Sequence, residues 1–390
     1  MSNETPVAAR TAAAADAAPA VPLMPGQRPP AASYDVALLD LDGVVYSGPD
    51  PIDGAVDALA AARKAGLRLA FVTNNASRSP SAIAEHLTRL GVPAGSADVV
   101  TSAQAAATLI ANRFPAGSPV LVAGSNGLRL AVRERGLRPV SLAADHPVAV
   151  VQGYAPDMNY GLLAEAGVAV RDGAFYVATN SDSTLPTPRG PQPGNGSLLQ
   201  VIITATGTRP VVAGKPETPL HAEAVARTGA RHPLVVGDRL DTDIEGAVRG
   251  GADAMLVMTG VTAARDAVLA PPGRRPTYVA ADLGGLLERQ PAIGPRGQAP
   301  KGRSRAPADG ETLESAARLA GPGGAAARAF RSSGWLARWP GGSGPLELTG
   351  DGAWIDGLRA LCAAAWAAEH VSADTVAPAL AALAALGEPR

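Results

Sequence analysis

Short apolar runs alternate with stretches of helical periodicity along most of this chain. The apolar runs that predict buried strands are 36–39, 67–72, 211–213, 234–237, 254–258 and 278–280. The stretches that predict helices are about 54–64, 79–90, 219–228 and 242–249. Alternation of this kind is typical of right-handed βαβ units that build one parallel sheet. We therefore predict an α/β fold with a Rossmann-like, parallel-sheet core.

A stretch of about a hundred residues interrupts this alternation, which is long for a loop. It has apolar runs of its own, at 119–124, 148–153 and 174–179. An insertion of this size with its own strand pattern is a domain. We predict a core in two parts, 34–102 and 207–288, and an inserted α/β domain over 103–206.

Both ends of the chain differ from this core in composition. Residues 1–33 are rich in Ala and Pro without a sustained apolar period, which predicts a disordered tail. Residues 289–310 are polar, basic and rich in Gly and Pro, which predicts a flexible linker. The extension over 311–390 holds all four tryptophans, and apolar residues recur at helical spacing from Ile355 to Trp366. We expect this extension to be small and mostly helical.

Charge and cysteine content narrow the classes of function. The 390 residues carry a formal net charge of −1, and no block of Lys or Arg indicates a nucleic-acid or anionic-membrane partner. No apolar run approaches the roughly 18 residues that a membrane span needs, and the first residues lack the pattern of a secretory signal. The single cysteine, Cys362, excludes an internal disulfide and fits a reducing compartment. We expect a cytoplasmic protein.

The residues that follow the first predicted strand suit phosphoryl chemistry. Asp40 and Asp42 lie two positions apart, so both carboxylates point the same way in an extended chain, and Gly43 allows a sharp turn after them. One carboxylate could attack phosphorus, and the other could protonate the leaving oxygen and then activate water. An isolated Asp-Leu-Asp-Gly run is often an ordinary turn, but the segments after the other strands favour the catalytic interpretation.

Groups that bind phosphate follow other predicted strands. Thr73 offers a hydroxyl group, and Asn74 and Asn75 offer donors to phosphoryl oxygens, although a Thr-Asn-Asn run can also cap the next segment. Lys215 supplies a cation against the charge of a transferred group, although a lysine before proline is more often a surface residue. Because the carboxyl ends of parallel strands meet at one edge of a sheet, we expect these groups to converge with Asp40.

Two further aspartates complete an acidic group that needs a cation. Asp238 follows the predicted strand 234–237, and Asp243 lies one helical turn into the next element. Carboxylates and a phosphate dianion repel one another, and Mg²⁺ is a hard cation that binds both. We predict Mg²⁺ as the cofactor, with Asp238 as a ligand and Asp243 orienting that ligand or its water. Asp241 is interpreted as a helix N-terminal residue favoured by the dipole.

Four motifs occur in a fixed order: DLDGVVYSG from Asp40, FVTNNASRS from Phe71, GKP from Gly214 and VVGDRLDTDIEGA from Val235. With the stretch 179–200, this order resembles subclass IIA of the haloacid dehalogenase superfamily of phosphohydrolases, over about residues 34–288. The resemblance implies a core with a C2-type cap and an aspartyl-phosphate mechanism, with Asp40 as nucleophile and Asp42 as general acid and base. It also implies Mg²⁺ held by Asp40, the main-chain carbonyl of Asp42, and Asp238. Asp at the position of Asp42 favours hydrolysis over ATP-driven transport.

The inserted domain would then be a cap that roofs the site, excludes water and selects small phosphate esters. Asp182 could accept hydrogen bonds from substrate hydroxyl groups, or it could be a solvated loop carboxylate. The other polar cap residues of interest are Asn180, Arg189, Tyr154, Asp157 and Tyr160. Gly194 and Gly196 are expected to shape the turn that returns the chain to the core.

The arrangement of tail, phosphatase and Trp-bearing extension is similar to that of actinobacterial glycerol 3-phosphate phosphatases. This similarity implies glycerol 3-phosphate as the substrate, with a sugar phosphate, phosphoglycolate or a nucleoside monophosphate as alternatives for the same chemistry. A non-catalytic sensor of a phosphorylated metabolite is a further alternative, disfavoured because the expected catalytic side chains are all present. As partners we expect a small phosphorylated metabolite and no nucleic acid, and a homo-oligomer is left open.

The role of the extension is the least determined. Residues 318–323 fit the R-x-x-G-x-G acyl-CoA loop of the acetyltransferase fold, but a helical pattern precedes them where that fold has a strand. We expect the extension to pack or to regulate rather than to acetylate, with a degenerate acetyltransferase-like domain left open.

Overall fold

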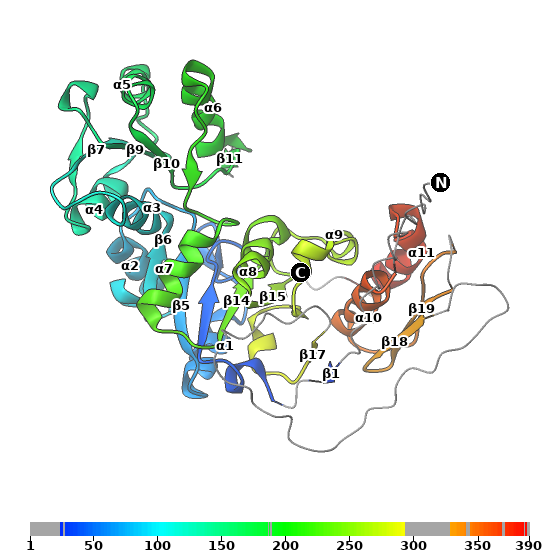
Figure 1. The fold of residues 1–390 in the computed structure, drawn as a ribbon. Coiled ribbons are helices and arrows are strands. Elements are labelled where there is room, and N and C mark those ends of the chain that lie inside the picture. Colours follow the sequence, from blue (N-terminus) through cyan, green and yellow to red (C-terminus); the bar gives the residue numbers. More distant parts are fainter. Residues whose placement is uncertain are drawn as a thin grey trace, which may run out of the picture.

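Six parallel strands form the central sheet of the core, and helices cover both of its faces (Figure 1). The computed structural model describes residues 24–25, 28–185, 187, 189–292, 328–340, 344–368, 371–385 and 387. The order of the strands across the sheet is β16 (Tyr278–Ala280), β15 (Asp253–Val257), β14 (Pro233–Gly237), β2 (Val36–Leu39), β5 (Arg68–Thr73) and β6 (Val99–Thr101). The main helices of the core are α1 (Ala55–Lys64), α2 (Pro80–Arg89), α7 (Thr218–Thr228), α8 (Glu245–Gly250) and α9 (Ala264–Val268). α3 (Ser102–Ala111), at the predicted start of the inserted domain, packs on α7 of the core and also on the next helix along the chain. The predicted parallel α/β core is confirmed.

Alternate residues of a buried strand face opposite layers of helices, as the period of a strand requires. In β2, Ala37 and Leu39 belong to an apolar cluster with residues of α1 and α2. Val36 and Leu38 belong to a second cluster with residues of α7 and α8. Burial on both faces explains why β2 is a continuous apolar run, and polar groups consequently gather where the strands end.

A second parallel sheet, of five strands, forms the inserted domain, which we call the cap (Figure 1). Its strand order is β13 (Val211–Val212), β10 (Phe175–Ala178), β9 (Ala149–Gln152), β7 (Pro119–Ala123) and β8 (Arg138–Val140). The helices of the cap are α4 (Asn126–Glu134), α5 (Tyr160–Arg171) and α6 (Asn195–Thr206). The three strands predicted for this domain are found as β7, β9 and β10.

The apolar run at 211–213 belongs to the cap sheet, so the prediction that the core sheet resumes there is wrong. β13 pairs in parallel with β10, with Val211 opposite Val177 and Val212 opposite Ala178. A run this short does not specify which sheet it joins, because the edge of either sheet can satisfy its main-chain hydrogen bonds. The chain therefore leaves the cap sheet only after residue 212 and reaches α7 at Thr218.

The residues just outside the predicted core limits are packed against it. β1 (Met24–Pro25) pairs antiparallel with β17 (Pro291–Ala292), so segments predicted as tail and linker meet. Ala31, in the short 3₁₀ helix Pro30–Ala32, is buried, and so is Gln290. The predicted disorder up to residue 33 and flexibility from residue 289 thus differ from the structure, because β1 pairs with β17 and because Ala31 and Gln290 are buried. Residues 1–23 and 293–310 lie outside the described residues.

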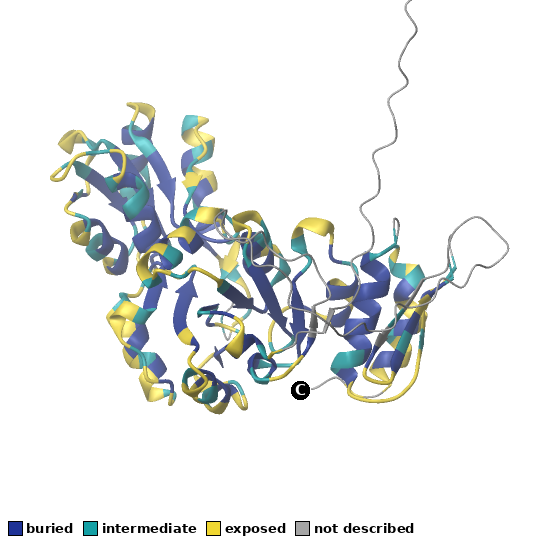
Figure 2. Cartoon of the chain, turned by 60° about the horizontal axis from the view of Figure 1, so that its bottom comes forward, coloured by how far each residue is buried: buried dark blue, intermediate teal, exposed yellow. Residues whose placement is uncertain are grey.

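The C-terminal extension combines a three-stranded antiparallel sheet with two helices. The strands are β18 (Arg328–Ser332), β19 (Trp335–Trp339) and β20 (Glu347–Thr349), and the helices are α10 (Trp354–Trp366) and α11 (Ala373–Ala384). The predicted amphipathic helix is α10, whose length is largely buried (Figure 2) where it packs on β18, β19 and α9. The sheet adds to the helices that were expected, and residues 318–323 lie outside the described ranges. Within those ranges, every helix is too short or too polar to cross a membrane.

Candidate active site

Polar residues lie at the carboxyl ends of three neighbouring core strands, at one edge of the sheet. Asp40 follows β2, Thr73 ends β5, and Asp238 follows β14. β2 lies between β5 and β14 and runs parallel to both, so the three carboxyl ends meet. The structure therefore places these three predicted site residues at the same edge.

Three carboxylates and one ammonium group form the centre of the site. One carboxylate oxygen from each of Asp40, Asp238 and Asp243 lies within 4.8 Å of the others. Lys215 Nζ donates to Asp40 Oδ1 at 2.5 Å and to Asp243 Oδ1 at 2.7 Å. Lys215, Asp238 and Asp243 each expose 3% of their surface or less. Four residues from distant parts of the chain are thus brought together in a buried cluster.

The helix predicted at 242–249 begins as a π-helical turn, Leu240–Ile244, before α8. This turn carries Asp243 back toward the end of β14, where Asp243 Oδ2 accepts the main-chain N–H of Arg239 at 3.2 Å. Asp243 consequently lies beside Asp238 and Lys215.

Negative charge at this centre exceeds what one lysine neutralises. Burial raises the pKa of Asp40 to about 8, and Asp243 and Asp238 add to the rise while Lys215 opposes it. Burial together with Asp243 raises the pKa of Asp238 to about 6. Burial acts to lower the pKa of Lys215, but Asp243 and Asp40 outweigh it and hold that pKa above its ordinary value. Lys215 therefore stays protonated, and in the described residues the ion pairs of these carboxylates are made with Lys215.

The donor set fits a hard divalent cation. Asp238 Oδ2 accepts the main-chain N–H of Val261 at 2.7 Å, whereas Asp238 Oδ1 is buried and has no hydrogen-bond partner among the residues the structure describes. A buried carboxylate oxygen without a partner is costly unless a cation binds it. Carboxylate oxygens are ligands that Mg²⁺ prefers. Asp40, Asp238 and Asp243 could therefore hold Mg²⁺ between them.

The loop after β2 passes close to Asp238. Gly43 has a φ of +82°, and a Cβ atom there would lie 2.6 Å from Asp238 Oδ2, so only glycine suits this turn. The same loop carries Asp42, whose side chain is exposed to solvent. Partial burial of its carboxyl group nevertheless raises the pKa of Asp42, against the opposing charge of Arg78. A carboxyl group with a raised pKa is suited to donating a proton.

Asn74 joins the core to the cap beside this centre. Its carboxamide oxygen accepts the main-chain N–H of Lys215 at 2.8 Å. Its carboxamide nitrogen donates to the carbonyl oxygen of Lys215 at 3.2 Å and to Asp182 Oδ2 at 3.3 Å. The main-chain carbonyl of Asn74 accepts from Asn180 Nδ2 at 2.8 Å. The Asn74 side chain is thus bonded to Lys215 and to the cap, and the predicted donation from the amides after Thr73 to a phosphoryl oxygen stays a prediction.

The two residues beside Asn74 have different environments. Thr73 is buried, and its hydroxyl oxygen accepts the main-chain N–H of Asn75 at 3.1 Å. Asn75 is exposed, and its carboxamide oxygen accepts hydrogen bonds from the main-chain N–H and the hydroxyl group of Ser77. Thr73 therefore lies where the sequence predicts it, while the Asn75 side chain stabilises a local turn.

Two of the predicted cap residues contact the core. Asn180 is buried and Asp182 is half-buried, and both bond to Asn74. Burial raises the pKa of Asp182, while Arg239 and Asn74 oppose the rise. The remaining predicted cap residues are more open: Tyr154 is half-buried, and Arg189, Asp157 and Tyr160 are exposed.

Gly194 and Gly196 shape a turn inside the cap, so the prediction that they return the chain to the core is wrong. A Cβ atom on Gly194 would lie 2.3 Å from the carbonyl oxygen of Asp182, and one on Gly196 would lie 2.2 Å from that of Ser181. The two glycines let the start of α6 pack on the loop that carries Asp182. The return to the core comes later, after β13.

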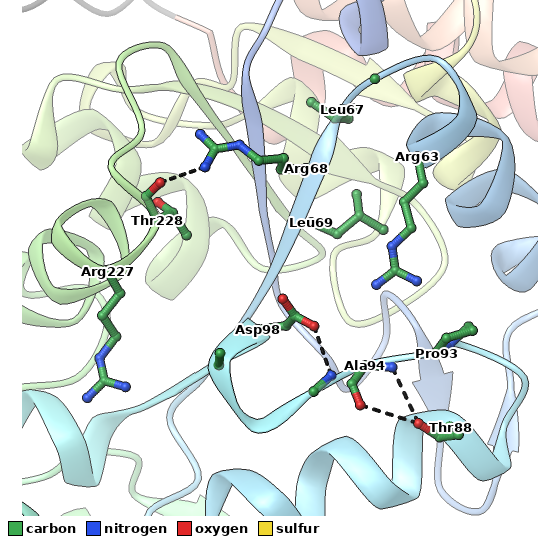
Figure 3. A pocket seen from close by; sticks show the side chains of 13 residues that line it. Arg63, Leu67, Arg68, Leu69, Thr88, Pro93, Ala94, Asp98, Arg227 and Thr228 are labelled. Carbon is green, nitrogen blue, oxygen red and sulfur yellow. Dashed lines mark hydrogen bonds between the residues drawn. The ribbon is translucent and has the colours of Figure 1, made fainter.

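A cavity of about 870 Å³ lies at the opposite, amino edge of the core sheet (Figure 3). The start of β5 and the carboxyl ends of α1 and α7 line it, with Arg63, Arg68 and Arg227 among the lining residues. Arg68 donates to the carbonyl oxygen of Thr228 at 2.7 Å, and Arg227 pairs with Glu223 at 2.5 Å. Two of these three guanidinium groups are thus already engaged, and none of the residues lining the cavity belongs to the carboxylate cluster.

Family models match both halves of the core. One described as haloacid dehalogenase-like hydrolase matches residues 37–138, and one described as HAD-hydrolase-like matches residues 212–286. A third, described as a GCN5-related N-acetyltransferase-like domain, matches residues 332–387 in the extension.

Individual proteins of known name are also similar to this chain. The D-glycerol 3-phosphate phosphatase of Mycobacterium tuberculosis is 52% identical over 256 residues, which are 66% of this chain and 72% of that protein. The chain belongs to the haloacid dehalogenase-like hydrolases. The 5′-nucleotidase YutF of Bacillus subtilis is 38% identical to this hydrolase over 232 residues, 59% of the chain and 89% of the relative. A crystal structure of glycerol phosphate phosphatase from M. tuberculosis in complex with magnesium matches it with a TM-score of 0.76 at 40% identity, covering 92% of this chain and 99% of that one.

Proposed function

We propose that this haloacid dehalogenase-like hydrolase is a Mg²⁺-dependent phosphatase of a small phosphorylated metabolite, with glycerol 3-phosphate as its substrate. The observation that carries the proposal is the convergence of Asp40, Asp238, Asp243 and Lys215 at the carboxyl edge of the core sheet. This cluster offers a nucleophile, a metal site and a fixed cation at one point. The relative with 52% identity is named a D-glycerol 3-phosphate phosphatase, which supports the choice of substrate.

Asp40 is the proposed nucleophile. Its carboxylate oxygen forms a bond to phosphorus while the bond from phosphorus to the alcohol oxygen breaks, which leaves an aspartyl phosphate. Asp42 donates a proton to the departing alcohol oxygen and then removes a proton from the water that attacks the aspartyl phosphate. Inorganic phosphate is released and the Asp40 carboxylate is restored. In this proposal the hydroxyl group of Thr73, at the end of β5, donates to a phosphoryl oxygen.

Positive charge makes the approach of a phosphate dianion possible. The Lys215 ammonium group holds Asp40 and Asp243 at hydrogen-bond distance and can stabilise charge on the phosphoryl oxygens. Asp40, Asp238 and Asp243, with the main-chain carbonyl of Asp42, would hold Mg²⁺. When bound, Mg²⁺ supplies the charge that offsets repulsion between the substrate and these carboxylates.

The cap is proposed to select the ester. Its loop at 180–182 is tied to the core through Asn74, which places polar cap residues beside the catalytic centre. A site covered in this way favours small esters over proteins or nucleic acids. A sugar phosphate, phosphoglycolate and a nucleoside monophosphate remain the alternative substrates, and the relative named as a 5′-nucleotidase supports keeping the last of these.

A panel of phosphate esters tests this proposal. Phosphate release by the full-length protein is measured with Mg²⁺ and each of glycerol 3-phosphate, phosphoglycolate, a sugar phosphate and a nucleoside monophosphate. We expect the highest kcat/KM for glycerol 3-phosphate. If another ester gives a higher kcat/KM, that ester replaces glycerol 3-phosphate as the proposed substrate. If none of the esters is hydrolysed, the proposed phosphatase activity is contradicted.

Asp182→Ala is expected to change selectivity more than chemistry. Asp182 is a half-buried cap carboxylate beside the core, so it can accept hydrogen bonds from substrate hydroxyl groups. We expect kcat/KM for glycerol 3-phosphate to fall about tenfold more than kcat/KM for a small aryl phosphate, which lacks such groups. Asp172→Ala, at an exposed position after α5, is the matched control. An equal loss on both substrates would assign Asp182 only to the contact with Asn74.

Asn74→Ala is expected to lower kcat roughly tenfold or more, which corresponds to about 1.4 kcal/mol in the activation barrier. The substitution removes both hydrogen bonds that the carboxamide makes to the Lys215 main chain, so the ammonium group loses its fixed position. The exposed Asn112, at the end of α3, provides the control variant Asn112→Ala. Steady-state kinetics with circular dichroism check the result, and an unchanged kcat in a folded protein would contradict the positioning role.

A further inference from the structure

The described part of the C-terminal extension contacts the core through the short helix α9 and the neighbouring edge strand β16. Trp366, the last residue of α10, donates from Nε1 to the carbonyl oxygen of Ala267 in α9 at 3.1 Å. Arg275, beyond α9, donates in return to the carbonyl oxygen of Trp366 at 2.9 Å. α11 also packs on α9. One end of α10 is therefore tied to α9 and to the segment that follows it.

A second anchor lies further back along α10. Arg359 exposes only 5% of its surface and donates from Nε to the carbonyl oxygen of Val279, in strand β16, at 2.7 Å. It also donates to Gln290 Oε1 and to Asp356 Oδ1, both at 2.9 Å. A buried guanidinium group with three satisfied contacts fixes α10 to the edge strand of the core sheet.

The loop at 258–263, between β15 and α9, connects α9 to the catalytic centre. The main-chain N–H of Val261 donates to Asp238 Oδ2 at 2.7 Å, and that of Thr262 donates to the Asp238 carbonyl oxygen at 3.2 Å. The hydroxyl group of Thr259 donates to the carbonyl oxygen of Gly43 at 2.6 Å. The loop thus holds a proposed metal ligand on one side and the turn after Asp40 on the other.

Neither the loop nor α9 is held strongly by its own local structure. α9 has five residues, and a helix of that length is not stable in isolation. The Val261 side chain is 71% exposed, so its own packing does little to keep its N–H group aimed at Asp238. The packing of α10 and α11 on α9 therefore adds support to the segment that carries the loop.

We propose that the C-terminal extension positions the loop at 258–263, which holds the proposed metal ligand Asp238, with Trp366 and Arg359 as its positioning residues; this rests on the proposed Mg²⁺-dependent function. The extension acts through Ala267 and α9 on the loop at 258–263, and through that loop on Asp238. It contributes no group to the chemistry. Its loss loosens the metal site around Asp238.

Two tryptophans of α10 provide a matched pair for the test. Trp366 and Trp354 are both buried, but Trp354 Nε1 has no hydrogen-bond partner within the described ranges. Trp366→Phe therefore removes the bond to Ala267, whereas Trp354→Phe removes an N–H group that makes none. The full-length variants are compared for Mn²⁺ affinity by electron paramagnetic resonance and for hydrogen exchange of the peptide spanning 258–268.

We expect Trp366→Phe to weaken Mn²⁺ binding about threefold to tenfold and to speed exchange in that peptide, and Trp354→Phe to change neither. Equal affinities and equal exchange in the two variants would overturn the proposal. Arg359→Lys, which keeps the charge but loses the forked contacts, decides the question if Trp366→Phe does not fold. If the wild-type protein binds no Mn²⁺, the proposed metal-dependent function fails, and the exchange comparison alone then decides whether the extension positions the loop.

Discussion

Asp40→Asn is expected to lower kcat by roughly a thousandfold or more, about 4 kcal/mol in the activation barrier. The amide keeps the shape of the side chain and can still accept a hydrogen bond from Lys215, but it cannot attack phosphorus. The fold should be retained, because the change removes one of three mutually repelling carboxylates from the buried cluster. Phosphate release and the midpoint of thermal unfolding, measured on the same preparation, check both expectations.

The matched control for this experiment is Asp241→Asn. Asp241 lies in the turn that carries Asp243, but it pairs with Arg239 at 3.0 Å at the surface and is not part of the carboxylate cluster. We expect its kcat to stay within about threefold of wild type, as for a surface ion pair of small free energy. If Asp40→Asn kept more than roughly a tenth of the wild-type kcat, covalent catalysis by Asp40 would be wrong.

Removal of divalent metal is expected to abolish turnover and to lower stability. Chelation leaves the carboxylates of Asp40, Asp238 and Asp243 with Lys215 as their counter-charge among the described residues. Mg²⁺ or Mn²⁺ should restore activity, whereas Ca²⁺ should inhibit because its larger and less regular shell can misplace the nucleophile. At about a hundred times its dissociation constant, Mg²⁺ should add about 2.7 kcal/mol to the free energy of unfolding.

Asp238→Asn tests whether the effects of Mg²⁺ on activity and stability come from binding at this site or from added salt in general. The substitution removes the charge next to the buried oxygen that has no partner in the described structure. We expect the variant to need a much higher Mg²⁺ concentration for half-maximal activity and to gain less stability from Mg²⁺ than wild type. Full activity of the wild-type protein after exhaustive chelation and dialysis would exclude the metal mechanism.

Features with a local signal could be predicted from the sequence. β2 and β14 are continuous apolar runs because both of their faces are buried, and each is followed directly by an aspartate of the site. A strand that reaches a sheet edge carries its next residue there, so Asp40 and Asp238 could be placed without coordinates. The sequence of β19 also carries the pattern of a strand, because its apolar residues Trp335, Ala337 and Trp339 recur at every second position. In the structure these three residues are buried and the residues between them are more exposed.

Features that depend on distant pairing could not be predicted. Asn74 meets Asp182 108 residues later and Lys215 141 residues later, and no local pattern distinguishes such an asparagine from one that contacts substrate. β13 has an apolar run but no indication of its partner strand, so the sequence pattern predicts the wrong sheet for it. The support of the loop at 258–263 by the extension is of the same kind, because its contacts arise only when the chain has folded.

The membership of β13 in the cap sheet has a practical consequence for exchanging caps between related enzymes. A chimera joined at residue 206 would leave Val211 and Val212 with the recipient core and strip the donor cap of its edge strand, exposing the main chain of β10. A junction after Val212 keeps the transplanted sheet whole and leaves Lys215 with its own core. Asn74 would still face a foreign loop in place of Asn180 and Asp182, so grafts should be drawn from donors that carry these two residues.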